Sequence, residues 1–277
     1  MGVIGPLKRI SSRTGIAILL IAAVAARASG LFAQEQSRVE SNQQKSEGQR
    51  RTEELLNDKK YSFQDLLEGN PGAVANAKEI FALTSDPKIK LRGASVLLSI
   101  GKADQAQFDY LTAEAEKALN YAAEMPWPTQ YDEKGEIVPN KPNPAFLKWC
   151  ANRKLNAWET FESAYYEVPI PWNFLAQARE PRAHDLLMRG LRSRNIIIVA
   201  LAAEGLARLQ ASDALDQVII AAQRAPLETR SSIGRALLFF PDPKAQAAAE
   251  KAFTDKESLE LWRKEIKAKG WKAFHDY

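Results

Sequence analysis

Carboxylates form the pattern in this sequence that comes closest to catalytic chemistry. Glu159 and Glu162 are three residues apart on a segment expected to be helical, and Asp132, Glu133 and Glu136 lie in an irregular segment before it. Two carboxylates about 5–10 Å apart across a cleft can cleave a glycosidic bond. Acidic residues on a helix more often form a solvated face. We therefore expect a non-catalytic protein and keep glycan cleavage as the alternative.

Metal, nucleophile and phosphate chemistry have less support. A metal site needs clustered ligands, and the chain offers only His184, His275 and one cysteine, Cys150. A Ser-His-Asp triad would need one of these histidines, and no G-x-S-x-G motif is present. The sequence SIGKA is similar to the end of a phosphate-binding loop, but Val96 and Ala103 replace the required glycine and hydroxyl residue. We expect no metal and no cofactor.

The candidate ligand-binding residues are Trp127, Tyr131 and Trp172, in a proline-rich insert over residues 124–180. A long irregular segment within a compact domain is usually functional or disordered, and abundant Pro and Trp favour an ordered one. Trp127 and Trp172 lie next to prolines and can either pin the insert to the rest of the protein or stack on a ligand. The ligand expected for exposed tryptophans in an exported protein is a sugar ring or a proline-rich peptide.

The second half of the insert is expected to contain one helix, from about Ala145 to Tyr166. Trp158, Phe161 and Tyr165 recur at i, i+3 and i+7, which is typical of a helix face turned to the core. The same face carries Leu147, Cys150 and Ala151. The sequence VPIPWNF, residues 168–174, is expected to break the chain before the next helices.

Outside the insert, start and stop signals predict short helices. The Asn-Pro pair at residues 70–71 is an N-cap followed by proline at the first helical position, and that helix should end near Leu83. The next helix should end at Gly101, a typical C′ glycine. Asp104 should cap a third helix that continues to about Ala123.

The apolar sequence RNIIIVALAAEGLARL, residues 194–209, combines strand and helix signals. Its isoleucines favour a strand, whereas its length, its alanines and the i, i+3, i+4, i+7 recurrence of apolar residues from Val199 favour a helix. We predict a helix from about Ile196 to Leu209, covered by neighbours on most sides. Its length and central Glu204 argue against a membrane span. Asp213 should cap the helix that follows.

Three segments of the chain repeat one pattern. They are GASVLLSIGKAD (residues 93–104), LAAEGLARLQASD (201–213) and SSIGRALLFFPD (231–242), with Leu97, Leu206 and Leu237 at equivalent positions. Each copy predicts a helix, a short break and another helix. Repeats of this kind indicate units that bury their apolar faces against one another.

This pattern resembles HEAT-like repeats over residues 71–123 and 181–253. The resemblance implies an all-α fold, an α-solenoid of antiparallel helical hairpins, and a role as a protein-binding scaffold without catalytic residues. Two features depart from the family. The sequence Phe239-Phe240-Pro241 stands where the family usually has Leu and Gly, and the insert separates the first copy from the others.

Residues 1–33 resemble a secretory signal peptide. Lys8, Arg9 and Arg13 precede an apolar region over residues 16–26. Ala26-Arg27-Ala28 fits the small-x-small cleavage rule, and Leu31-Phe32-Ala33 is a second candidate cleavage site. Residues 34–60 are polar, lack aromatic residues before Tyr61, and are expected to form a flexible linker with a helix near Thr52. The helical domain should occupy residues 61–277. We expect export to a bacterial periplasm or the exterior, with no membrane span after signal cleavage.

The charge distribution argues against nucleic acid as a partner. The net charge of +4 comes entirely from the four basic residues of segment 1–33, and the rest of the chain is neutral. The expected function is an exported, non-catalytic protein–protein interaction scaffold. The alternative is an envelope protein that binds or cleaves a glycan through the Trp-rich insert.

Overall fold

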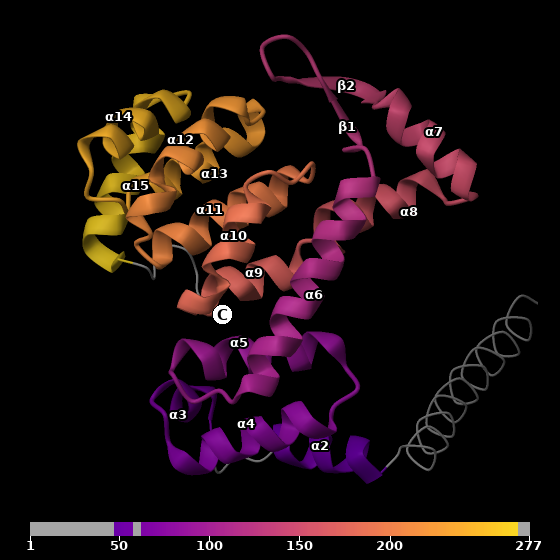
Figure 1. The fold of residues 1–277 in the computed structure, drawn as a ribbon, viewed down its shortest axis with the longest axis vertical. Helices are drawn as coiled ribbons and strands as arrows, with labels where there is room; N and C mark the ends of the chain where they lie inside the picture. Colours follow the sequence, from indigo (N-terminus) through magenta and orange to yellow (C-terminus); the bar gives the residue numbers. More distant parts are fainter. Residues whose placement is uncertain (1–46, 58–61, 271–277) are drawn as a thin grey trace, which may run out of the picture. The chain divides into compact units, whose positions relative to one another are not determined.

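The computed structural model describes residues 47–57 and 62–270 (Figure 1). The predicted signal peptide, residues 1–33, lies outside these ranges. Of the predicted linker, the structure describes mainly helix α2, Glu47–Asn57, which is longer than the helix expected near Thr52. The chain divides into two units, Met1–Glu54 and Leu55–Tyr277, and the elements below belong to the second. In the described ranges, every helix is too short or too polar to cross a bilayer.

The first helices after residue 62 are α3 (Phe63–Leu67), α4 (Pro71–Leu83), α5 (Pro87–Ser99) and α6 (Gln105–Glu124). Helix α3 was not predicted, whereas α4, α5 and α6 begin or end close to the predicted signals. Asn70 caps α4 by accepting a hydrogen bond from the backbone N–H of Gly72. Gly101 adopts a φ of +66° after α5, as expected of a C′ glycine. The backbone N–H of Asp104 binds the side chain of Gln107 at the start of α6.

The insert folds into a β-hairpin followed by short helices, not into one long helix. Its elements are β1 (Thr129–Tyr131), β2 (Ile137–Pro142), α7 (Pro144–Arg153), α8 (Ala157–Glu162) and a π-helical turn (Ser163–Glu167). The prediction of a single helix over residues 145–166 is wrong because Lys154 adopts a left-handed conformation with φ +55°. Asn156 then caps a new helix by accepting from the backbone N–H groups of Trp158 and Glu159.

The proline-rich sequence after the π-helical turn forms helix α9, Ile170–Gln177, so the predicted break at residues 168–174 is also wrong. Prolines are tolerated in the first turn of a helix, where the missing N–H would have no partner within the helix. Helix α9 packs against α5, α6 and α11. It therefore belongs to the main core and not to the insert.

The C-terminal part contains six α-helices with a short 3₁₀ turn before two of them. They are α10 (His184–Gly190), α11 (Ile196–Arg208), α12 (Leu215–Arg224), α13 (Leu227–Leu237), α14 (Pro243–Ala252) and α15 (Lys256–Lys269), and the turns are Pro181–Ala183 and Ser212–Ala214. The apolar segment at residues 194–209 is helical, as predicted, and Asn195 caps it. Asp213 does not cap α12, because it lies inside the second 3₁₀ turn.

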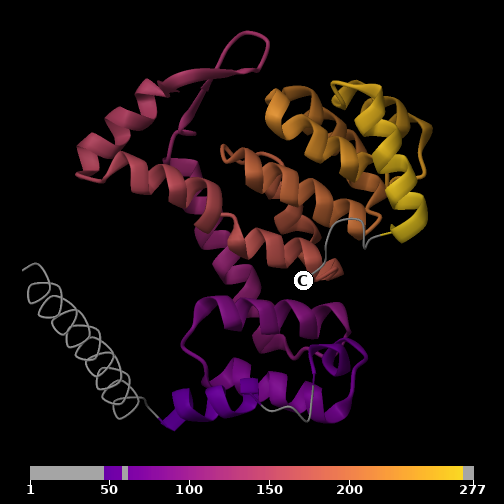
Figure 2. The ribbon, with the colours of Figure 1, turned by 180° about the vertical axis from the view of Figure 1, so that it is seen from behind.

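The C-terminal helices pack against one another in one region of the molecule, as Figure 1 and Figure 2 show. Helix α11 packs between α9 and α13 and also contacts α10, while α12 contacts α13 and α14. Leu97, Leu206 and Leu237, which are equivalent in the three sequence copies, are each completely buried. Each of these leucines is near the end of a helix that precedes a turn.

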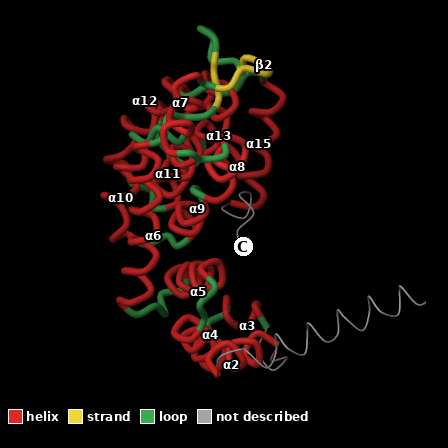
Figure 3. The backbone as a smooth tube through the Cα atoms, turned by 90° about the vertical axis from the view of Figure 1, so that its right-hand side faces the viewer, coloured by secondary structure: helices red, strands yellow, loops and turns green. Residues whose placement is uncertain are grey.

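The described residues are mainly helical, in agreement with the predicted all-α class, and their strands form one two-stranded antiparallel sheet (Figure 3). Two apolar clusters hold the fold. The larger runs through α4 to α6 and α9 to α14. The smaller lies in the insert and contains Met125, Trp127, Phe146, Trp149, Cys150 and Ala164, with Ile196 and Ile197 of α11 packed against it.

Candidate functional site: an aromatic groove

A groove with a cavity volume of about 660 Å³ lies between the β-hairpin, α7, α8 and the π-helical turn. We call it the aromatic groove. Its lining is mostly apolar and comprises Pro128, Thr129, Ile137, Val138, Lys141, Pro142, Phe146, Leu147, Ala157, Trp158, Phe161, Tyr165, Tyr166 and Glu228. Figure 1 shows the hairpin, α7 and α8 between the end of α6 and the start of α9. Ligand sites are commonly concave, apolar and furnished with a few polar groups.

A ladder of stacked rings forms one wall of the aromatic groove. The rings of Trp158 and Phe161 are stacked with centroids 5.6 Å apart and an interplanar angle of 6°. Phe161 stacks in turn on Tyr165 at 4.8 Å. Trp158 is 66% exposed and Tyr166 is 73% exposed. Large aromatic side chains this open on a folded chain are candidates for ligand contact.

The exposure of Trp158 corrects the prediction that it belongs to the core. The i, i+3, i+7 spacing keeps Trp158, Phe161 and Tyr165 on one side, as expected. However, the chain turns at Lys154, so α8 has its own direction and buries a different face, which carries Thr160. The apolar spacing correctly predicted that the three rings share one side, but the prediction that this side faces the core is wrong for Trp158.

Hydrogen bonds among polar side chains beside the groove hold Thr129, Tyr165 and Glu228 of its lining in place. The Trp127 indole Nε1–H donates to the Tyr131 hydroxyl at 3.0 Å, and the Tyr131 hydroxyl donates to Glu228. The hydroxyls of Thr129 and Tyr165 are hydrogen-bonded to each other. Burial raises the pKa of Tyr131, and the hydrogen bond to Glu228 raises it further. Burial likewise raises the pKa of Tyr165. Both phenols therefore keep their protons at neutral pH.

The β-hairpin, which carries Thr129 and Tyr131, is anchored to α13. The backbone N–H of Leu227 donates to the carbonyl of Gly135 at 3.0 Å. Gly135 has a φ of +79°, a conformation that side-chain-bearing residues rarely adopt. The Asp132 carboxylate accepts from the backbone N–H groups of Lys134 and Glu136. The hairpin side of the groove is thus held to α13 at two points, the tip of the hairpin and Tyr131.

The structure separates the three predicted ligand-binding residues. Trp127 and Tyr131 are hydrogen-bonded to each other beside the groove, and Trp127 is largely buried in the smaller cluster. Trp172 lies elsewhere, in the larger cluster, with 0% exposure. Its indole Nε1–H donates to the carbonyl of Ala115 at 2.9 Å. Trp172 has no ring face open to a ligand, which corrects the stacking alternative for this residue.

Sequence reasoning missed Trp158, Tyr166 and Glu228 as residues of the groove. One signal was present for Trp158: Asn156 is a strong N-cap residue, and Glu159 three positions later completes a typical helix start. A helix that begins at Ala157 places Trp158 in its first turn, where few neighbours cover it. The contribution of Glu228 depends on contacts about a hundred residues apart along the chain, for which the sequence carries no local signal.

The carboxylates proposed for catalysis take different positions. The Asp132 side chain is used in the hairpin turn, and Glu159 accepts a hydrogen bond from the side chain of Asn156. Among the residues that line the aromatic groove, the one carboxylate is Glu228. In residues 47–57 and 62–270, no three His, Cys, Asp or Glu side chains are grouped so that they could hold a metal ion.

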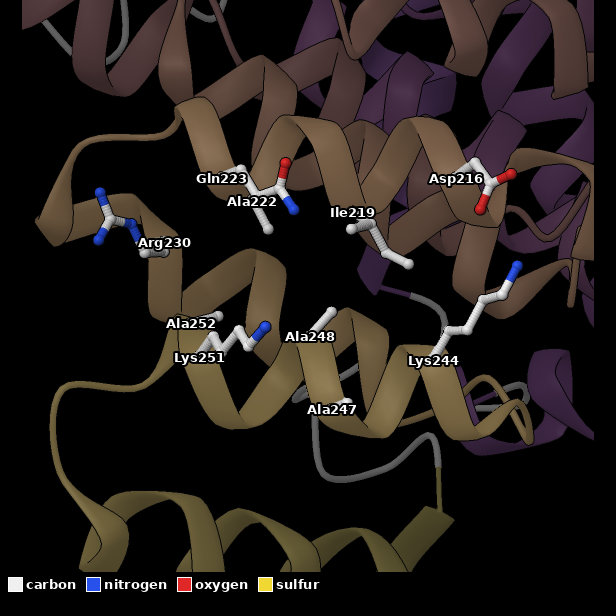
Figure 4. Close-up of a pocket in the computed structure, with 10 residues that line it drawn as sticks. All are labelled: Asp216, Ile219, Ala222, Gln223, Arg230, Lys244, Ala247, Ala248, Lys251 and Ala252. Carbon is white, nitrogen blue, oxygen red and sulfur yellow. The ribbon is translucent and has the colours of Figure 1, made fainter.

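A second cavity, of about 560 Å³, lies between α12 and α14 (Figure 4). Its floor consists largely of small residues, including Ala222, Ala248 and Ala252, so space remains between the two helices. Lys244 and Lys251 stand at its rim together with Asp216. Surface lysines beside an acidic residue do not define a ligand, and this cavity lacks the exposed rings of the aromatic groove.

Comparisons with known proteins do not assign a ligand to the aromatic groove. No family model and no curated protein sequence matches the chain, and no solved structure matches its fold.

Proposed function

We propose that this chain is an exported, non-catalytic binding protein that holds a segment of a partner protein in the aromatic groove. The observation that carries the proposal is the open ring ladder, on which Trp158 and Tyr166 are exposed. The ladder is held by the stacking of Phe161 on Tyr165 and by the hydrogen bond between the hydroxyls of Tyr165 and Thr129. Exposed aromatic side chains contribute large contact areas at low conformational cost and dominate many binding interfaces. The preorganised wall adds affinity because little order must be gained on binding.

We further propose that the helices outside the insert form a HEAT-like solenoid that presents this groove. Support comes from the two sets of contacts: α9, α11 and α13 pack in sequence, and α12 packs on α14. The repeated leucines at residues 97, 206 and 237 occupy equivalent buried positions. Stacked helical pairs leave extended surfaces that are typically used to hold another protein.

Export is part of the proposal because of the sequence at the N-terminus. The basic, apolar and small-residue regions of segment 1–33 occur in the order of a signal peptide. A bacterial periplasm or the exterior is the proposed location. N-terminal sequencing of the mature protein tests this point: cleavage after residue 28 or 33 supports export, and a protein that retains Met1 contradicts it.

The binding role can be tested by photo-crosslinking in intact cells. A benzoyl-phenylalanine introduced at Tyr166 should crosslink to one partner protein, with the crosslinks mapped to a single segment of that partner. The matched control carries the same group at Leu261 of α15, which is 57% exposed but lies outside the groove. The proposal fails if the Tyr166 position gives no crosslink or only the same products as the Leu261 position.

One observation favours a glycan as a second candidate ligand. The Trp158 ring, which is 66% exposed and stacked on Phe161, offers a flat apolar surface, which is a suitable platform for the face of a sugar ring. Under this alternative, a neutral oligosaccharide should bind the chain and should lose binding when Trp158 is replaced by alanine.

A further inference from the structure

We propose that the occupant of the aromatic groove is an extended, proline-containing peptide segment in the polyproline II conformation. This inference rests on the proposed binding function and specifies the chemistry of its partner. Polyproline II segments are preformed and have no internal hydrogen bonds. They typically dock into grooves lined by aromatic side chains.

The hydrogen-bonding inventory of the groove favours a peptide over a sugar. A sugar presents many hydroxyls, each of which needs a partner when it is buried. In the lining, the hydroxyls of Thr129 and Tyr165 are hydrogen-bonded to each other, and Glu228 already accepts from Tyr131 beside the groove. Most of the remaining lining is apolar. A proline-containing segment suits this surface because its rings are apolar and each proline lacks a backbone N–H.

Two donors remain open at the ring ladder. In the described part of the chain, the indole Nε1–H of Trp158 and the hydroxyl of Tyr166 have ring contacts but no hydrogen-bond partner. Free donors beside apolar rings match a ligand that offers carbonyl oxygens and few N–H groups. A polyproline II backbone is such a ligand, since its carbonyls are solvated and unpaired before binding.

The sheet edge of the hairpin argues against the other common way of binding an extended peptide. A ligand that added a strand to β2 would need backbone N–H groups along that strand. Pro139 and Pro142 lie within β2 and provide none. These prolines oppose a new strand on β2, so we expect side-chain contacts with the ring ladder to hold the segment.

The charges of the groove predict what flanks the prolines. Glu228 accepts hydrogen bonds from the hydroxyls of Tyr131 and Tyr165. Lys141, the one basic residue of the lining, has no ion-pair partner among the described residues. We therefore expect an acidic residue beside the proline run to strengthen binding, and added salt to remove this gain.

The test is a titration of the full chain, observed through its tryptophan indole N–H signals by nuclear magnetic resonance. The probes are an end-blocked decaproline, the same peptide with two added aspartates, a Gly-Ser decapeptide and a neutral β-1,4-linked glucose hexasaccharide. We expect decaproline to shift the Trp158 signal saturably, the aspartates to tighten binding, and the Gly-Ser peptide to have no effect. The signal of buried Trp172 should stay unchanged.

Variants separate the contribution of the rings from that of the donor. Trp158→Phe keeps a ring but removes the N–H and should weaken decaproline binding about tenfold, while Trp158→Ala should abolish it. Leu261→Ala, an exposed apolar change outside the groove, should bind as the unchanged chain does. Because Trp158 is exposed, its variants should stay folded, which circular dichroism verifies.

Each of the following results would overturn the inference. The inference fails if decaproline leaves the Trp158 signal unchanged. It also fails if Trp158→Ala binds decaproline as tightly as the unchanged chain does, because decaproline then binds elsewhere. Binding of the hexasaccharide alone would identify the groove as a glycan site. If none of the probes binds while Tyr166 still crosslinks to a partner, the binding function stands and the proline-containing class is wrong. If crosslinks also fail, both proposals fall.

Discussion

At the scale of single residues, Gly190 packs tightly against Trp172 in the main core. A Cβ atom on Gly190 would stand 2.2 Å from the ring atom Cζ3 of Trp172 and 2.8 Å from the Cβ of Ala202. Gly190→Ala should therefore lower the free energy of unfolding by about 1–3 kcal/mol, as overpacking does. Urea denaturation measures the change.

Gly93 provides the matched control for this substitution. It lies within α5, and a Cβ there would meet nothing within 4 Å. Gly93→Ala should raise the free energy of unfolding by up to about 1 kcal/mol through helix propensity alone. Equal effects of the two substitutions, whatever their sign, would show that Gly190 does not lie against Trp172.

Tyr131 and Tyr165 give the groove wall a pH dependence at this same scale. Burial raises the pKa of both phenols in the folded chain, whereas in the unfolded chain the pKa of tyrosine is about 10. As the pH rises above about 10, the unfolded chain loses these protons first, so stability that is fully present below this pH declines. Urea denaturation between pH 8 and 11 should show a steeper decline for the unchanged chain than for Tyr131→Phe. Parallel declines would contradict the burial of Tyr131.

At the scale of elements, Asn195 links α11 to the π-helical turn of the insert. Its side-chain oxygen caps α11 by accepting from the backbone N–H groups of Ile197 and Ile198. Its amide Nδ2–H donates to the carbonyl of Ala164, in the π-helical turn, at 2.9 Å. The residue is 1% exposed, so neither group can bind water instead.

Asn195→Ala should therefore cost more stability than the loss of an ordinary cap. Loss of a cap costs about 1 kcal/mol, and an unpaired buried carbonyl adds about 1–3 kcal/mol. Asn70→Ala removes a cap that binds only Gly72 and should show the cap contribution alone. Thermal or urea unfolding of the two variants measures the difference, and similar losses would contradict the link between α11 and the insert.

The elements also show what local sequence can and cannot predict. Caps and glycines placed the ends of α4, α5 and α11 correctly because these signals act within a few residues. The turn at Lys154 was missed because a non-glycine residue in the left-handed conformation has no strong sequence signature. The prolines of residues 168–174 suggested a break because proline both ends and begins helices. Tertiary packing of α9 on α5, α6 and α11 decided between the two outcomes.

At the scale of the whole unit, residues 55–277, one tryptophan packs the core and another is exposed in the aromatic groove. Trp172 is enclosed in the larger apolar cluster, where it contacts Gly190 and donates to Ala115. Trp158 lies on a short helix whose ring ladder faces solvent. The sequence indicated that the insert would carry any binding site, but it could not say which tryptophan is open, because burial depends on neighbours from distant parts of the chain.

Radical footprinting of the full chain, read residue by residue through mass spectrometry, tests the central claim most directly. The claim is that the folded chain presents an open aromatic groove that a proline-containing segment covers. We predict rapid oxidation of Trp158 and Tyr166, little oxidation of Trp172, and protection of Trp158 and Tyr166 alone when decaproline is added. Trp158 that reacts as slowly as Trp172, or that gains no protection from decaproline, would contradict the account.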